Sequence, residues 1–532
     1  AAPRAGAATD TAARALGPAV PADTAAAPVD TVPITSPLYT YGVSTRGARL
    51  ATAWLDQYPS MAGGRRGGPA QILPDGSEVL GLTLVAGADT VRLDRWDFTP
   101  SADSLAVAGA PARLTLTAAR GALGVELAYT FHPDDYRIDV RGRVSGLGPE
   151  GGLLLVGLGP GLRNTEADSV ENARALSVVV KDDESTAYPF ADLEPGQPAT
   201  WSGPFDWVAV KSKYFVTAVL ALDSTRPRIS GATAAAPATA GKDPALADVR
   251  LSIPVTARGD FGYTVYAGPM EYPRLRAFGH DFDDVNPYGW PGFRTIIRAV
   301  SIPVRAFLVW MHDRLGIAYG VGLIVFGILV RIVLWPLNQK AMRASMAMQA
   351  IQPELKAIQE RYKDNPQQLQ QEVFKLYREH GVNPFGGCWP MLLPLPILFA
   401  LFFVFQYTIE LRGAPFLWIP DLSRPDPYYI IPILMGLSMY VVTRVGQIGM
   451  EPNPQMKMML YVMPIMMTVL LLNFAAGLNL YYAVQNVASI PQQWLIARER
   501  QRRQAPQPKP EARSKPPAGG RPAGGRGPGR RK

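Results

Sequence analysis

The sequence predicts a multidomain protein in which an all-β sandwich domain precedes an all-α membrane bundle of five spans. Turn-punctuated strands of alternating polarity fill the first half, and long uncharged helical stretches fill the second. The charge is uneven as well. Residues 498–532 hold 12 Lys and Arg against two acidic residues, whereas the other 497 residues sum to −1. A near-neutral body with a basic tail excludes a generally basic nucleic-acid binder.

The N-terminal residues 1–36 are rich in Ala, Pro and Thr and show no periodicity. Such a composition predicts a disordered linker. The chain opens with Ala rather than Met, so we expect that an upstream segment is missing or removed.

Residues 37–290 are expected to form one all-β domain. Apolar side chains alternate along two neighbouring stretches, at Val125, Leu127, Tyr129 and Phe131 and again at Ile138, Val140 and Val144. The residues between them, His132-Pro133-Asp134-Asp135, favour a turn. The pattern therefore predicts an antiparallel hairpin within a sandwich.

Residues 291–314 are expected to form an amphipathic helix in the membrane interface. Its apolar residues recur at helical spacing: Phe293, Ile296, Ile297, Val300, Val304, Phe307 and Leu308. Arg294, Arg298 and Arg305 fall on the other side, and Pro303 should bend the helix. The alternative is an ordinary surface helix of the β domain.

The transmembrane core is predicted at 315–497. The expected spans are 317–335, 391–409, 428–442, 458–472 and 477–491. Lys457 and Arg498 bracket 40 uncharged residues, or about 60 Å of helix, which is twice the roughly 30 Å of a hydrocarbon core. That stretch must therefore fold back on itself near 473–477.

Lys and Arg set the expected orientation of the spans. The connections 337–390 and 443–457, together with the tail, hold 21 of them, and the opposite connections hold two. The positive-inside rule then places the tail in the cytoplasm and the β domain outside.

Residues 338–382 are expected to form a cytoplasmic helical hairpin. Two apolar stripes flank a break at Asp364-Asn365-Pro366. The stripes comprise Met342, Met346, Leu355, Ile358 and Tyr362 before the break, and Leu369, Val373, Leu376, Tyr377 and His380 after it. They can pack against each other while the tip of the hairpin docks partners.

Arg331 is the first candidate site residue, because it lies inside the first span. An arginine in hydrocarbon costs at least about 2.5–3.5 kcal/mol, so it should face protein, water or a partner. Near the end of the span it could instead extend its guanidinium to the interface.

Polar residues on other spans help to decide whether Arg331 faces the interior of the bundle or extends to the interface. The last span carries Asn479, Tyr481, Tyr482, Gln485, Asn486 and Ser489, and Asn338, Gln406 and Thr443 lie at comparable depths. They can hydrogen-bond across helices or line a wet cavity open to the cytoplasm, and we favour the cavity.

Two apolar stripes complete the candidate surfaces. Phe399, Phe402, Phe403 and Tyr407 line one face of the second span, and Met459, Met463, Met466 and Met467 line a face of the fourth. Such side chains can adapt to varied apolar partners, or they can simply pack the bundle.

Other chemistries find little support in the sequence. With one Cys and four His, the chain offers no disulfide pair and no Cys/His cluster at metal-ligand spacing. A solute transporter would also explain polar residues in spans, but we detect no internal repeats. A carbohydrate-active β domain could use His132, Asp134 and Asp135, although these residues fit a turn better than an acid/base pair.

Several motifs resemble the YidC/Oxa/Alb family of membrane protein insertases. They are Val330-Arg331 with Trp335-Pro336-Leu337, Val382-Asn383-Pro384, Gly386-Gly387-Cys388-Trp389-Pro390, Glu410-Leu411-Arg412, Ala414-Pro415-Phe416, Asp426-Pro427-Tyr428-Tyr429 and Pro432-Ile433-Leu434-Met435-Gly436. The resemblance is close over about 290–500. Over 38–288 the layout resembles the periplasmic β-supersandwich of Gram-negative members, which carry a further span ahead of it.

The resemblance implies an inner-membrane insertase and chaperone without covalent chemistry, metal, nucleotide or other cofactor, and therefore not an enzyme. Arg331 matches the groove arginine of the family and Tyr482 an aromatic groove position, and we place Gln485 and Thr443 in the same substrate groove. The hydrophobic slide would comprise Phe399, Phe402, Phe403, Met459, Met463 and Met466. The implied partners are nascent membrane proteins, the Sec translocon, the ribosome and the lipid bilayer, with no small-molecule substrate.

The basic tail has three possible roles. Its Arg and Lys residues, interleaved with Gly and Pro, cannot build a core. They can contact ribosomal RNA phosphates, bind anionic lipid or enforce the topology.

Overall fold

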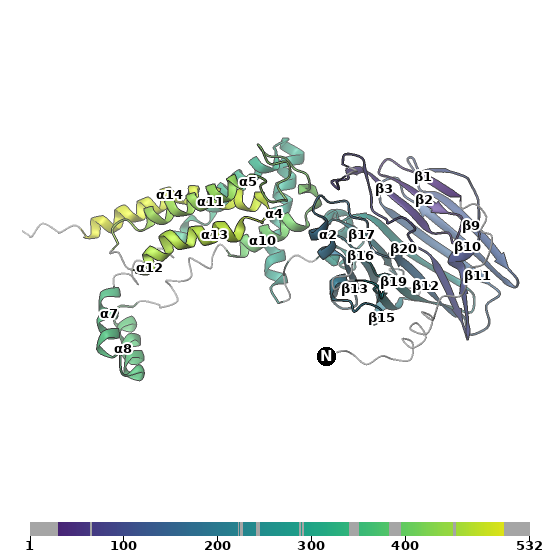
Figure 1. The fold of residues 1–532 in the computed structure, drawn as a ribbon, viewed down its shortest axis with the longest axis horizontal. Coiled ribbons are helices and arrows are strands. Elements are labelled where there is room, and N and C mark those ends of the chain that lie inside the picture. The colour runs from purple at the N-terminus through teal and green to yellow at the C-terminus, as the bar shows by residue number, and fades with distance from the viewer. Residues whose placement is uncertain are drawn as a thin grey trace, which may run out of the picture.

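A computed structural model describes residues 30–504, apart from 64–65, 222, 224–226, 241–244, 287–288, 290–291, 340–350, 382–394 and 451–453. Several expectations fall outside these residues: most of the linker, the Met342 and Met346 part of the hairpin, the motifs at 382–390 and the tail beyond 504. Figure 1 shows a β domain joined end-on to an elongated helical region.

The β domain contains three sheets. The first has the order β4-β3-β2-β1-β8, with β1 Thr31–Thr35, β2 Tyr39–Ser44, β3 Leu50–Pro59, β4 Pro69–Gln71 and β8 Leu105–Ala106. The second has the order β14-β13-β16-β17-β20-β11-β10-β9-β7, with β7 Thr99–Pro100, β9 Ala112–Arg120, β10 Leu123–Phe131, β11 Arg137–Ser145, β13 Ser177–Lys181, β14 Ser185–Pro189, β16 Trp207–Lys211, β17 Phe215–Leu220 and β20 Asp260–Pro269. The third has the order β15-β18-β19-β12-β5-β6, with β5 Leu82–Ala86, β6 Asp89–Arg92, β12 Gly152–Gly159, β15 Pro198–Phe205, β18 Ile229–Ala235 and β19 Asp248–Val255. Short helices α2 (Ser169–Ala175) and α3 (Tyr272–Ala277) complete the domain.

The hairpin expected around residues 125–144 is confirmed as β10 and β11. The strands pair antiparallel, with Val125 opposite Val144 and Phe131 opposite Ile138. Their alternating apolar side chains are buried, because only one face of the sheet meets the core.

The linker expectation was wrong at its end, because Thr31–Thr35 is strand β1. This strand buries Val32 and Ile34 while exposing the residues between them. The Ala- and Pro-rich composition of the preceding residues masked this short alternation of period two.

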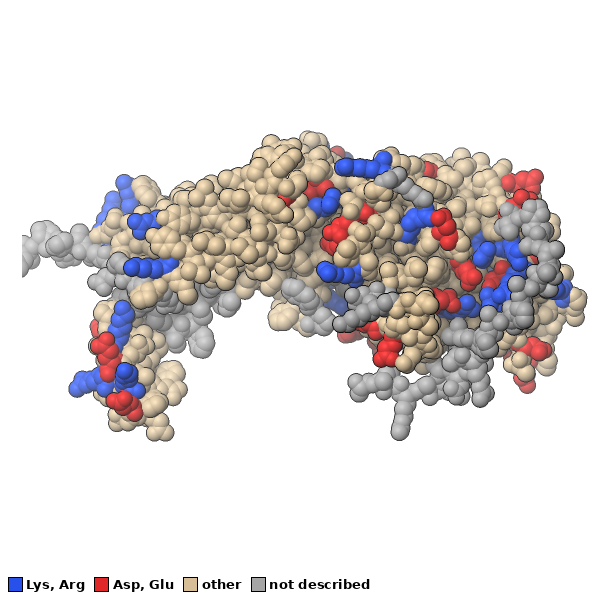
Figure 2. Space-filling view, viewed as in Figure 1, with Lys and Arg blue, Asp and Glu red and all other residues tan. Residues whose placement is uncertain are grey.

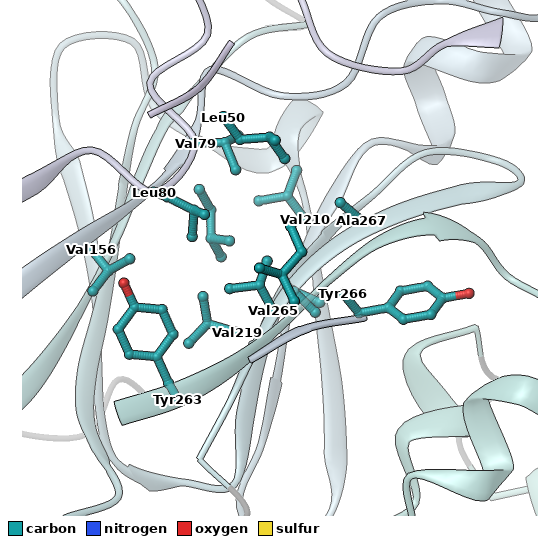
Figure 3. Packing of buried hydrophobic residues seen from close by; sticks show 14 of the residues in the cluster. Leu50, Val79, Leu80, Val156, Val210, Val219, Tyr263, Val265, Tyr266 and Ala267 are labelled. Atoms are coloured by element: carbon teal, nitrogen blue, oxygen red, sulfur yellow. The ribbon is translucent and has the colours of Figure 1, made fainter. Parts of the chain in front are cut away.

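One continuous core connects the three sheets. Figure 3 shows Leu50 of β3, Val156 of β12 and Val219 of β17 converging on the same apolar interior. Two of its buried tyrosines donate their hydroxyl groups to backbone carbonyls: Tyr41 donates to the Ala267 carbonyl at 2.6 Å and Tyr129 to the Ala48 carbonyl at 2.8 Å. These two rings therefore contribute apolar area without an unpaired polar group.

The helical region contains α4 Arg294–Leu315, α5 Tyr319–Val333, α10 Leu395–Tyr407, α11 Ile430–Gly446, α12 Pro454–Lys457, a π-helical turn at Met458–Val462, α13 Met463–Leu471 and α14 Ala476–Gln504. Among the described residues, α4 alone is long and apolar enough to cross a membrane by length and composition. The apolar helices at 319–333, 395–407, 430–446 and 458–471 are shorter and fall within or near four of the expected spans. On the face seen in Figure 2, charged side chains are sparse along this region and gather at its end away from the β domain.

Helix α4 uses its arginines differently from a helix that is solvated on its polar side. Arg298 pairs with Asp283 and Asp284 of the β domain, and the buried Arg305 pairs with Glu410. The arginine side therefore contacts protein, and part of the apolar stripe does so too, because Ile297, Val304 and Leu308 are buried while Phe293 and Ile296 are exposed. An interfacial position of α4 stays a prediction.

The two amphipathic stripes after residue 350 form α7 (Gln352–Arg361) and α8 (Pro366–Glu379), which pack against each other. The Asn365 side chain accepts a hydrogen bond from the Gln368 amide at 3.2 Å and caps α8, with Pro366 at its first position. In Figure 1 this helix pair projects from the end of the helical region opposite the β domain.

The segment between α10 and α11 fastens the helical region to the β domain. Arg412 donates from Nε to the Glu166 carboxylate at 2.9 and 3.0 Å, and from its terminal nitrogens to the carbonyl groups of Pro59 and Thr165. Farther along, the fully buried Asp426 accepts bonds from the backbone amides of Tyr428 and Ile431, and it thereby caps α11. The Arg412 contacts therefore join this segment to the β domain, and the Asp426 contacts fix the start of α11.

Candidate functional site

Arg331 lies in the last turn of α5, about 18 Å along the helix axis from Tyr319 at its other end. Its side chain is partly buried and donates from Nη2 to Gln492 Oε1 at 2.7 Å. Within the described part of the chain, Arg331 has no acidic side chain within ion-pair distance, and its Nε makes no hydrogen bond. The guanidinium is thus held by a neutral amide, which leaves its charge unneutralised.

A cavity of about 140 Å³ surrounds this guanidinium. It is lined by Val330, Arg331, Leu334, Asn338, Ile397, Leu398, Tyr481, Tyr482, Gln485, Asn486 and Ser489. The structure therefore brings together Arg331, Tyr482 and Gln485, which the sequence analysis assigned to one groove. Thr443 lies on α11 and is not among the lining residues, so the structure does not support its assignment to the groove.

The polar residues of α14 also hold the helices together. Gln485 donates to the Gly327 carbonyl of α5 at 2.9 Å, and Asn486 donates to Ser438 Oγ of α11 at 3.0 Å. Asn479 donates to the Leu471 carbonyl at 3.0 Å and stabilises the α13–α14 turn. The two interpretations of these residues are therefore compatible, because side chains that bond across helices also line the cavity.

Gln492 was not among the residues predicted from the sequence, although it contacts Arg331 directly. It also donates to the Trp335 carbonyl at 3.3 Å, so it bridges two points of the same helix end. Gln485, Ser489 and Gln492 are spaced by four and three residues and share one helix face. That spacing was the signal that could have identified it.

The two apolar stripes differ in how far their side chains are exposed. On α10, Phe403 is 4% exposed and packs with Phe402 and Tyr407, in a helix that contacts α4 and α14. On the segment that contacts α11, Met459 and Met466 are about half exposed, at 47% and 49%. The Met side chains are thus free to meet other apolar groups, whereas Phe403 serves mainly as packing.

His132 and Asp135, which were considered for a carbohydrate-active site, lie in the turn between β10 and β11. His132 lies 2.8 Å from Asp139, and Asp135 accepts a bond from the Tyr136 amide and lies 3.5 Å from Arg274. Burial raises the pKa of the Asp135 carboxyl, and Arg274 opposes that shift. These groups are engaged in holding the turn.

Comparison with known proteins covers both parts of the chain. Residues 31–298 match the family described as YidC periplasmic domain, and residues 310–504 match the family described as 60Kd inner membrane protein. The Chlorobaculum tepidum protein "Membrane protein insertase YidC" is 30% identical over 87% of this chain and 81% of its own length. The protein of the same name from Geobacter sp. strain M21 is 31% identical over 87% and 85%.

Two further matches extend the comparison. The chain spans 66% of the length of the Chlorobium luteolum protein "Membrane protein insertase YidC", with 34% identity. A solved structure, "Active YidC insertase crystal structure with the first transmembrane domain resolved", aligns over 88% of this chain and 94% of its own, at 18% identity and a TM-score of 0.36. On the family matches and the long sequence alignments, the chain belongs to the YidC family of membrane protein insertases.

Proposed function

We propose that this protein is a membrane protein insertase of the bacterial inner membrane. It moves transmembrane segments and short polar tails from the cytoplasm into the bilayer through the groove around Arg331, alone or with the Sec translocon. Long alignments with relatives named as insertases support this activity. The observation that carries the mechanism is an arginine that, among the described residues, is held by a neutral amide and no carboxylate, in a cavity between helices.

The groove acts by shortening the distance that a polar substrate tail must cross through hydrocarbon. A polar tail that crosses about 30 Å of hydrocarbon leaves peptide groups unsatisfied, each at a cost of several kcal/mol. Hydrogen-bonding groups of Tyr482, Gln485 and Asn486 replace part of that lost hydration. Arg331 attracts acidic or polar tails inward, because its charge is not neutralised by a neighbouring carboxylate.

Release follows from the apolar part of the substrate. A hydrophobic segment slides along exposed apolar side chains, of which Met459 and Met466 are the most accessible of the proposed set, and then partitions into lipid. Phe399 and Phe402 contribute the other part of this slide, and the buried Phe403 packs against Phe402.

The topology that fits this direction places the β domain in the periplasm and the α7–α8 pair in the cytoplasm. In Figures 1 and 2 the β domain and the Lys- and Arg-bearing end lie at opposite ends of the molecule. The basic tail at 498–532 and the α7–α8 pair then face the ribosome and the inner-leaflet lipids. The polytopic solute transporter is not favoured, because the relatives are named insertases.

Reconstitution tests the proposal. The purified chain in liposomes should insert a single-span substrate with an acidic tail, and Arg331→Ala should lower that insertion about tenfold. Arg331→Lys should retain part of the activity, and a substrate with a neutral tail should be affected less. Arg444→Ala is the matched control, because Arg444 is an exposed arginine on α11 that does not line the cavity. Unchanged insertion of every substrate by Arg331→Ala would refute the role of the charge.

A further inference from the structure

A second cavity lies where the β domain meets the helical region. Its volume is about 700 Å³, within the size range of small-molecule sites. The β domain contributes residues of α2, β14 and β16, and the helical region contributes the end of α10 and the α13–α14 turn. It therefore lies at the end of the helices opposite to the groove around Arg331.

The two walls of this cavity differ in character. The wall from the β domain carries the cations Arg174, Lys211 and Lys213. The wall from the helical region presents the apolar side chains Phe402, Phe405, Phe474 and Leu478, beside the polar Gln406, Ser423 and Asn473. A ligand that matches both walls has an anionic end and an apolar end.

The charges within the cavity do not cancel locally. Lys213 pairs with Glu171 at 2.9 Å, and Asp168 accepts a bond from the Glu171 amide and caps α2. Among the residues that the structure describes, neither Lys211 nor Arg174 has a carboxylate within ion-pair distance. After these pairings the cavity retains positive charge.

Lys211 is the more unusual of the two, because its side chain is only 6% exposed. Its Nζ lies 3.5 Å from the Ala175 carbonyl and 5.6 Å from the centre of the Tyr407 ring, which are both weak contacts. Burial lowers the pKa of Lys211 to about 8, so the charged form persists at neutral pH at a cost in free energy. An anion at this position would offset that cost.

We propose that this cavity binds the headgroup of an anionic phospholipid from the outer leaflet, with the phosphate at Lys211. The acyl chains leave along Phe402 and Phe474, on the wall formed by the helices that enter the bilayer. The apolar wall favours a lipid over a free phosphate, which would leave those rings in contact with water. This site is separate from the cavity around Arg331, although it shares Phe402 with the proposed slide, and the assignment to the outer leaflet rests on the topology proposed above.

Native mass spectrometry of the full chain, after exchange of its lipids, tests the site. Phosphatidylglycerol should be retained on the wild-type protein, and Lys211→Met should weaken that retention about tenfold. Lys211→Arg should keep it. Lys181→Met is the matched control, because Lys181 is a buried lysine on the adjacent strand β13 that has its own partner, Asp281. A thermal unfolding curve for each variant establishes that it is folded.

Competition distinguishes the sources of phosphate. Phosphatidylcholine, glycerol phosphate and inorganic phosphate should each displace phosphatidylglycerol poorly. Equal binding of phosphatidylcholine would overturn the role of the negative charge, and equal binding of inorganic phosphate would overturn the lipid assignment. Unchanged retention by folded Lys211→Met would overturn the site itself.

Discussion

Arg412 and Glu166 form a buried ion pair across the junction between the helical region and the β domain, with side chains 2% and 10% exposed. Two residues earlier, Glu410 pairs with Arg305 of α4. Neighbouring positions of one short segment therefore bind partners on two sides. This arrangement gives a physical role to the Glu410-Leu411-Arg412 motif, which the sequence alone could only match to a family.

The first prediction concerns this junction. Arg412→Ala leaves the Glu166 carboxylate buried and unpaired, and it removes the donor for two carbonyl groups. Breaking a buried pair in this way costs about 3–5 kcal/mol. Hydrogen exchange should accelerate around Glu166 and along 410–424, and the melting temperature should fall. Arg314→Ala is the control, because Arg314 is an exposed arginine at the end of α4. Equal exchange in both variants would show that the pair does not fasten the domains.

The second prediction concerns the start of α11. Asp426 accepts hydrogen bonds from the amides of Tyr428 and Ile431 and from the Trp418 indole at 3.1 Å. Asp426→Ala should lower the free energy of unfolding by about 2 kcal/mol, because a cap and a buried acceptor are lost together. Chemical denaturation in detergent measures this effect. The exposed Asp313 provides the control substitution to Ala, and a loss of similar size there would contradict the capping role.

The third prediction concerns Gln492, which holds Arg331 in place. Gln492→Leu should reduce insertion of acidic-tail substrates about threefold, less than Arg331→Ala, because the charge remains but its position is freed. In the double variant the two effects should not add, since both act through the same guanidinium. Insertion assays on the four proteins of the cycle provide the measurement. Full additivity would separate the roles of the two residues.

The fourth prediction concerns pH and stability in the absence of anionic lipid. The pKa of Lys211 is about 8 in the folded protein and 10.5 as the ordinary value. Below pH 8 the lysine is charged in both states, and its burial destabilises the fold by about 3 kcal/mol. Between pH 8 and about 10.5 the unfolded state binds more protons, so stability should rise with pH.

The comparison with Lys211→Met isolates this contribution. In lipid-free detergent the variant should be more stable than wild type at pH 7, and the difference should vanish as the pH approaches 10.5. Unfolding curves at matched pH values measure it. A variant less stable than wild type at pH 7 would show that the charge of Lys211 is already compensated by protein groups.

Several elements of the fold could be predicted from the local periodicity of apolar residues. Alternation predicted the β10–β11 hairpin, and helical spacing predicted the α7–α8 pair, because each depends on neighbours in the sequence. Strand β1 escaped notice because its pattern covers only five residues. The arginines of α4 were placed opposite its apolar stripe, but their partners could not be predicted, because Asp283 and Glu410 come from other elements.

Part of the candidate site could also be predicted from the sequence. A lone arginine in an apolar span is conspicuous, so Arg331 could be chosen from the sequence, and Tyr482 and Gln485 followed from the polarity of the last span. Thr443 was placed by depth alone, and depth does not say which face of a helix a residue occupies. The phenylalanine and methionine stripes were grouped by chemistry, but Phe403 is buried while Met459 and Met466 are about half exposed.

Because Glu410 and Arg412 are only two residues apart, one short segment links the β domain to helix α4. A force applied to the β domain at Glu166 would reach α4 through two successive ion pairs, Glu166–Arg412 and Glu410–Arg305.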